Sequence, residues 1–222
     1  MNKQDILTVV KKVRESSPKR KFVQTVDVIF NLRNLDLKKE TDKVNTFVTL
    51  PFPIGKKLRV TALVGQELAT KAKGVCDTVV VNDEFKSLGI KRIKKLSQET
   101  DYFIAQANIM PQIAATFGKI LGPRGKMPNM KAGCIVQPTA DLKPLFERLQ
   151  KTIRVETKNE PTLKTRVGLE SAKDEELVEN INSLYTTVLG LLPQDKNNLK
   201  DVLVKTTMGK PVVLWSSKVT AA

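Results

Sequence analysis

Residues 58–82 read LRVTALVGQELATKAKGVCDTVVVN, and this stretch decides the fold class. A β-branched apolar run opens it, an amphipathic segment with alanine and lysine follows, and a second β-branched run closes it. A strand, a helix and another strand in succession are typical of parallel sheets with crossover helices. The stretch therefore predicts an open α/β sheet with helices on its faces.

The same alternation continues to about residue 151. A basic helix containing KRIKK (91–95), a strand DYFIAQ (101–106) and a helix over 109–121 come first. A strand GCIVQ (133–137) and a helix LKPLFERLQK (142–151), which Asp141 can cap, follow. The KRIKK run is interpreted mainly as a solvated helix face and secondarily as an electrostatic contact.

The flanking segments have a different pattern. An apolar face at residues 6–13 predicts a helix that ends before Pro18. Two-residue alternation over 22–32 predicts a half-buried strand. Further strands are predicted at residues 44–50, at IRVETK (153–158) and at LKTRVGLE (163–170), and the last two at KDVLVKTT (200–207) and PVVLWS (211–216). The longest helix has an apolar stripe that includes Leu191, is stopped by Pro193, and starts at a capping box of Ser171 and Asp174.

Because the two ends of the chain share a pattern that the middle lacks, we expect one domain inserted in another. The rigid PFPIG turn (51–55) marks the first crossover. The predicted domains are residues 1–53 with 154–222, and residues 54–153.

Composition and charge limit the classes of function that the protein can have. The chain has 222 residues, 41% of them hydrophobic, with a formal net charge of +15, which suits nucleic acid or an anionic membrane. No apolar run approaches the roughly 18 residues of a membrane span, and the polar start predicts no signal peptide, so we expect a soluble intracellular protein.

Histidine is absent, which disfavours acid–base catalysis near neutral pH. The acidic run 174–176 suits a helix start. Cys76 and Cys134 lack metal-site spacing and predict buried free thiols.

The segment ILGPRGKMPNMKAG (120–133) is glycine-rich and cationic. A nucleotide-binding P-loop would need glycine at 120 and serine or threonine at 127, where the chain has Ile120 and Met127. Two interpretations remain: a stiff loop that approaches a polyanion, or a solvated basic turn.

Three motifs together resemble the L-one family of large-subunit ribosomal proteins, most closely its archaeal branch. They are LGPRGKMPN (121–129), KTTMGKP (205–211) and KFVQTVDV (21–28). Met130 departs from the proline usual in the family. The resemblance implies an α/β protein: an α+β terminal domain of split βαβ type with an inserted Rossmann-like three-layer α/β domain.

The resemblance also implies a function. The expected protein is cytoplasmic, noncatalytic, free of cofactors and metals, and monomeric when free of the ribosome. Its expected partners are large-subunit rRNA at the mobile stalk, tRNA leaving the E site, its own mRNA, which it represses, and other ribosomal components, with no membrane. The implied RNA contacts are Phe22, Thr25, Asp27, Lys158, Lys164, Thr207, Met208 and Gly209, and secondary electrostatic contacts are Arg124, Lys126 and Lys131.

These residue types suit RNA. A threonine hydroxyl can pair with a 2′-OH, glycine permits close approach of the backbone, and methionine offers an adaptable apolar contact. Phe22 fits either a base stack or the core, and Asp27 either accepts from RNA or orients a neighbouring cation. Competing hypotheses are an ordinary hairpin turn at 207–209, an RNA-processing or nucleotide-using enzyme on the α/β domain, and a generic basic chaperone or membrane-surface binder.

Overall fold

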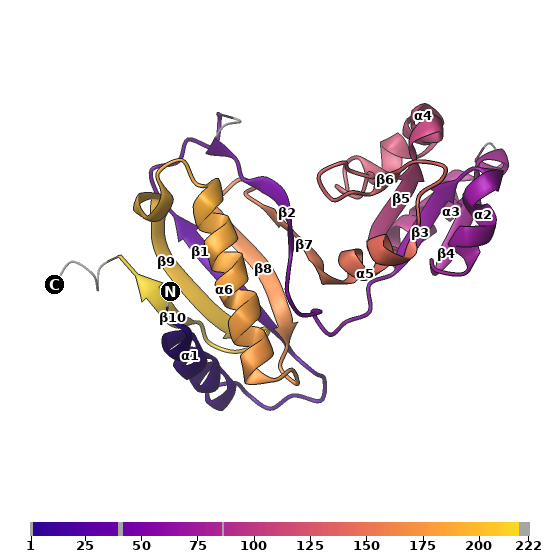
Figure 1. The fold of residues 1–222 in the computed structure, drawn as a ribbon. Coiled ribbons are helices and arrows are strands. Elements are labelled where there is room, and N and C mark those ends of the chain that lie inside the picture. Colours follow the sequence, from indigo (N-terminus) through magenta and orange to yellow (C-terminus); the bar gives the residue numbers. More distant parts are fainter. Residues whose placement is uncertain (1, 40–41, 86, 218–222) are drawn as a thin grey trace. The chain divides into compact units, whose positions relative to one another are not determined.

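The computed structural model describes residues 2–39, 42–85 and 87–217 and divides the chain into two compact units (Figure 1). The terminal unit comprises Met1–Lys56 and Lys151–Ala222, and the inserted unit comprises Lys57–Gln150. The sequence placed these boundaries at 53/54 and 153/154. Residues 151–153 go with the terminal unit because the Leu50 N–H donates to the Lys151 carbonyl at 2.9 Å and a paired strand begins at Thr152.

The terminal unit is a two-layer α+β structure. Its elements are α1 (Lys3–Glu15), β1 (Thr25–Leu32), β2 (Asn45–Thr49), β7 (Thr152–Glu156), β8 (Thr162–Leu169), α6 (Asp174–Leu191), a 3₁₀ turn (Asp195–Asn198), β9 (Leu199–Thr206) and β10 (Val212–Ser216). The main sheet has the order β10-β9-β1-β8, with antiparallel neighbours. Strands β8 and β9 therefore run parallel on either side of β1 and are joined by α6, which confirms the predicted split βαβ arrangement.

One face of this sheet is covered by α1 and α6 (Figure 1). Along β1, Val26, Val28 and Phe30 point into that core and are at most 1% exposed, as their two-residue spacing predicts. Thr25, Asp27, Ile29 and Asn31 lie on the opposite side, which we call the outer face.

The start and end of α6 differ from the prediction. The predicted capping box is wrong: Lys173 is the N-cap residue without a side-chain cap, and Asp174 instead forms a 2.9 Å ion pair with Arg14 of α1. Leu191 is 40% exposed, while Leu192 is buried, because the residue before Pro193 leaves the helical conformation and turns inward.

The inserted unit has the predicted strand–helix alternation. Its elements are β3 (Val60–Val64), α2 (Gln66–Lys73), β4 (Thr78–Val81), a 3₁₀ turn (Asn82–Glu84), α3 (Ile90–Glu99), β5 (Tyr102–Gln106), a 3₁₀ turn (Ala107–Ile109), α4 (Met110–Leu121), β6 (Ile135–Val136) and α5 (Lys143–Lys151). All strand pairs are parallel, in the order β4-β3-β5-β6. The direction of crossover reverses after β4, so right-handed connections place α2 on one face of the sheet and α3 with α4 on the other. This is the expected three-layer α/β fold.

Two further features bear on function. Cys76 and Cys134 are free and buried in the inserted unit, as predicted. Among the described residues, no helix is long and apolar enough to cross a membrane.

Candidate nucleic-acid interface

Thr25, the first residue of β1, and Thr207, just beyond β9, are joined by several hydrogen bonds. The Thr207 N–H donates to the Thr25 carbonyl at 3.0 Å, and the Thr25 N–H donates to the Thr207 Oγ1 at 3.1 Å. Their two hydroxyl oxygens are 2.9 Å apart. The pairing of β1 with β9 thus extends into the TTMG turn and fixes two hydroxyls side by side at an exposed end of the sheet.

The buried side chain of Gln24 forms a hydrogen bond with the backbone of this turn. Its side chain is only 1% exposed, and its Oε1 accepts from the Met208 N–H at 3.0 Å. Its Nε2 donates to the Ser17 Oγ and to the Pro18 carbonyl, each at 3.0 Å. The bond to Met208 links the turn to the segment between α1 and β1, and the two bonds to Ser17 and Pro18 fix Gln24 within that segment, so the turn has a defined shape.

Packing explains the glycine of the turn. The Gly209 N–H donates to the Thr206 carbonyl at 3.1 Å, and a Cβ at position 209 would lie 2.3 Å from the Thr206 Oγ1. That hydroxyl is itself fully buried and 2.8 Å from the Ser17 Oγ. Gly209 is therefore needed because no side chain fits against the buried pair of hydroxyls.

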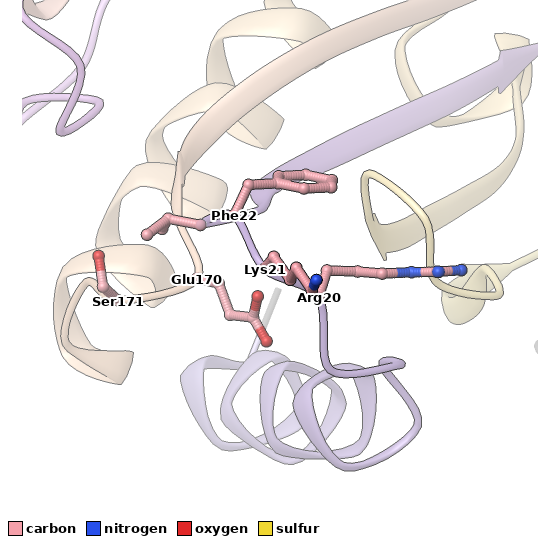
Figure 2. A pocket seen from close by; sticks show the side chains of 6 residues that line it. Arg20, Lys21, Phe22, Glu170 and Ser171 are labelled. Atoms are coloured by element: carbon pink, nitrogen blue, oxygen red, sulfur yellow. The ribbon is translucent and has the colours of Figure 1, made fainter.

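Exposed apolar and cationic side chains lie beside the turn. Met208, Phe22 and Val23 are each more than half exposed. An open hollow of about 340 Å³ is lined by Arg20, Lys21, Phe22, Val23, Glu170 and Ser171. Figure 2 shows the Phe22 ring and the Arg20 side chain extending from the segment before β1 toward the same side. The alternative that Phe22 is a core residue is wrong.

Asp27 lies in a row of charges on the outer face. Its cross-strand neighbours are Lys205 on β9 and Arg166 on β8. Burial raises the pKa of the Asp27 carboxyl, and the Thr25 hydroxyl, Lys205 and Arg166 oppose the shift. This environment suits a carboxylate that orients neighbouring cations.

Lys158 and Lys164 belong to the other end of the outer face. Lys164 pairs in register with Ile29, and Lys158 lies in the β7–β8 connection. Each has an acidic neighbour: Lys158 is 3.5 Å from Glu156, and Lys164 is 3.4 Å from Glu160. The structure therefore groups Phe22, Thr25, Asp27 and the turn 207–209 together but does not bring these two lysines to them.

Two cations of the glycine-rich segment form hydrogen bonds within the inserted unit. The Lys126 Nζ donates to the carbonyls of Ser97 (2.9 Å) and Thr100 (2.5 Å), and Arg124 donates to the Ser97 hydroxyl. These groups belong to the C-terminal end of α3, whose carbonyls lack partners within the helix. Burial lowers the pKa of Lys126. The loop thus anchors α3, and the predicted contact of Arg124, Lys126 and Lys131 with an anionic partner stays a prediction.

Many α/β proteins bind nucleotides at the carboxyl end of the parallel strands. Here a backbone N–H at that end is already hydrogen-bonded within the inserted unit. The N–H of Gly65, between β3 and α2, donates to the Gln106 Oε1 at 2.8 Å. The amide that a phosphate would use is therefore satisfied by a side chain of the same unit.

Gln24, Ser17 and Thr206 are not among the site residues expected from the sequence. A signal was present, because Gln24 is in phase with Val26 and Val28, and Thr206 is in phase with Val202 and Val204. A polar residue at an inward-facing position needs a buried hydrogen-bond partner.

Comparison with known proteins identifies the family of this chain. Residues 11–210 match the model of the Ribosomal protein L1p/L10e family. The chain is 39% identical to large ribosomal subunit protein uL1 of Methanobrevibacter smithii, over 95% of this chain and 98% of the relative. It is 39% identical to the uL1 protein of Nanoarchaeum equitans (91% and 96% covered) and 35% identical to that of Pyrococcus abyssi (95% of each). The chain therefore belongs to the ribosomal protein L1p/L10e family and is of its archaeal type.

Proposed function

We propose that this protein binds folded rRNA of the large ribosomal subunit through the end of the sheet formed by Phe22, Thr25, Asp27 and the turn 207–209. The observation that carries the proposal is the anchored Thr25–Thr207 pair, with exposed Met208 and Phe22 beside it. The family is noncatalytic, and its members are constituents of the large subunit in the cytoplasm.

Each group has a role that its chemistry supports. The paired threonine hydroxyls face a ribose edge, where they exchange hydrogen bonds with 2′-OH groups. Met208 and Phe22 supply apolar contacts with a ribose or an unstacked base, and Arg20 and Lys21 neutralise nearby phosphates. Because Gln24 and Ser17 fix the turn before RNA arrives, little ordering entropy is lost on binding.

Three finer functions belong to the same proposal. The protein assists tRNA leaving the E site, represses its own mRNA through an RNA element like its rRNA site, and changes the angle between its units about the two chain crossings. The two crossings near residues 56 and 151 support the last of these, since two short connections act as a hinge. Identical interdomain angles in free and RNA-bound protein would count against the hinge.

The test is discrimination between RNAs. Purified full-length protein is titrated with a stalk fragment of large-subunit rRNA and with a scrambled RNA of equal length, near physiological salt. The proposal expects preference for the stalk fragment by at least about 1,000-fold, the lower range for specific nucleic-acid binders. Equal affinity for both RNAs would leave only a nonspecific basic protein.

A further inference from the structure

Helix α3 of the inserted unit presents a dense cationic surface. Its exposed side chains include Lys91, Arg92, Lys94 and Lys95, which we call the α3 cation face. Residues three or four apart on a helix are neighbours, so these groups form one patch. Within the part of the chain that the structure describes, none of the four forms an ion pair.

This charge placement opposes the stability of the helix itself. Lys91 and Arg92 lie in the first turn, where the helix dipole disfavours cations, and no acidic residue is present there. Lys91 and Lys95 repel each other at a spacing of four residues. The N-cap residue, Gly89, provides no side-chain hydrogen bond. The charges therefore do not serve the fold, and an anionic partner would relieve their repulsion.

The remainder of the unit holds α3 in place. Ile93 is 3% exposed, and it packs with Leu96 into the core shared with α4. At the other end, Lys126 and Arg124 of the glycine-rich loop bind the last turn. The α3 cation face is thus a fixed surface, which reduces the entropy lost when it binds.

The same packing selects the kind of partner. A cationic amphipathic helix binds a membrane by inserting its apolar stripe, but Ile93 and Leu96 of this stripe are already packed against α4, leaving only Ile90 exposed at the start of the helix. A phosphate backbone needs only the cations. We propose that the α3 cation face is a second RNA contact, which binds the phosphate backbone without reading sequence.

The test compares two matched triple variants of the full-length protein. One, K91Q/K94Q/K95Q, removes three charges from the α3 cation face. The control, K71Q/K73Q/K143Q, removes three exposed lysines of α2 and α5 in the same unit. Affinity for an unrelated RNA hairpin is measured from low to physiological salt. Equal reactivity of Cys76 and Cys134 toward a thiol reagent checks that both variants keep the folded inserted unit.

The plot of log K against log salt should be less steep for the α3 variant than for wild type, by about 2 to 3 in slope, the value for three lost phosphate contacts. The control should change the slope by less than about 1. Equal slope changes in the two variants would overturn the proposal. The proposal would also be overturned if the α3 variant lost binding to phosphatidylserine vesicles while its RNA binding stayed intact, because that result would mean a membrane partner. The proposed function is separate: it fails if wild type does not prefer the stalk fragment, whatever the slopes.

Discussion

The backbone N–H of Met208 donates to the side-chain Oε1 of the buried Gln24 at 3.0 Å, and this bond ties the exposed TTMG turn to the segment before β1. The two residues are far apart in the chain, yet one amide side chain connects the turn with Ser17 and Pro18. The candidate RNA-binding surface therefore depends on a residue that RNA itself need not touch.

Replacing that residue should weaken RNA discrimination even in protein that is still folded. Gln24→Ala leaves the Met208 N–H without its partner, which should cost about 1 to 3 kcal/mol of stability. Under conditions where the variant is folded, its preference for the stalk fragment over scrambled RNA should fall at least tenfold, because the turn is no longer fixed. Gln4→Ala, at an exposed position of α1, is the control. Full discrimination in Gln24→Ala would mean that the turn keeps its shape without this bond.

Gly209→Ala should be destabilising because its Cβ would lie 2.3 Å from the Thr206 Oγ1. If this clash is the cause, a second substitution, Thr206→Ala, should relieve it. A double-mutant cycle by urea unfolding should then show Gly209→Ala costing at least about 1 kcal/mol less in the Thr206→Ala background. Additive effects would place the cause elsewhere.

Lys126→Gln should loosen the end of α3. Loss of its bonds to the Ser97 and Thr100 carbonyls should destabilise the inserted unit by about 1 to 3 kcal/mol. Burial raises the pKa of Cys76 and of Cys134 to about 11, so both react slowly until the unit opens, and faster thiol labelling reports the change.

The terminal unit provides the internal control for this variant. Its Trp215 is the single tryptophan of the chain, and its fluorescence transition should not move. Lys119→Gln, at an exposed position of α4, should change neither signal. A shift of the tryptophan transition alone would contradict the assignment of Lys126 to α3.

Asp27→Asn should change the pH dependence of stability. Burial raises the pKa of Asp27 above its usual 3.8, so the charged carboxylate destabilises the folded state at pH 7, and this penalty disappears as the pH falls and the group takes up a proton. The variant should therefore be more stable than wild type at pH 7, with the difference shrinking toward pH 4. Urea midpoints at the two pH values measure it. Lower stability of the variant at pH 7 would mean that attraction to Lys205 and Arg166 outweighs burial.

Much of the fold was predictable because its signals are local. The alternation at Val26, Val28 and Phe30 and the strand–helix succession from residue 58 onward correspond to observed elements. The start of α6 was not predictable, since Asp174 is drawn into an ion pair with Arg14, a residue of a distant helix. Strand β6 is only two residues long where five were expected, because the bend at Gly133, with φ of 70°, belongs to the preceding loop.

The candidate site was predictable only through its motifs. Resemblance indicated Thr25 and the turn 207–209, but the hydrogen bonds that join them depend on the pairing of β1 with β9, which no local pattern specifies. The hydrogen bonds from Lys126 to the C-terminal end of α3 were not predictable, because they join a loop to a helix that is distant in the sequence.

The most direct test of the central claim is the affinity of Thr207→Ala for the stalk fragment of rRNA near physiological salt. Thr207 shares its hydroxyl contact with Thr25 at the surface, so its loss should weaken specific binding by about 1 to 3 kcal/mol, roughly 5- to 150-fold. Affinity for scrambled RNA should not change, and Thr186→Ala, on the exposed side of α6, should match wild type. Undiminished preference of Thr207→Ala for the stalk fragment would contradict the account and place the specific contact away from this turn.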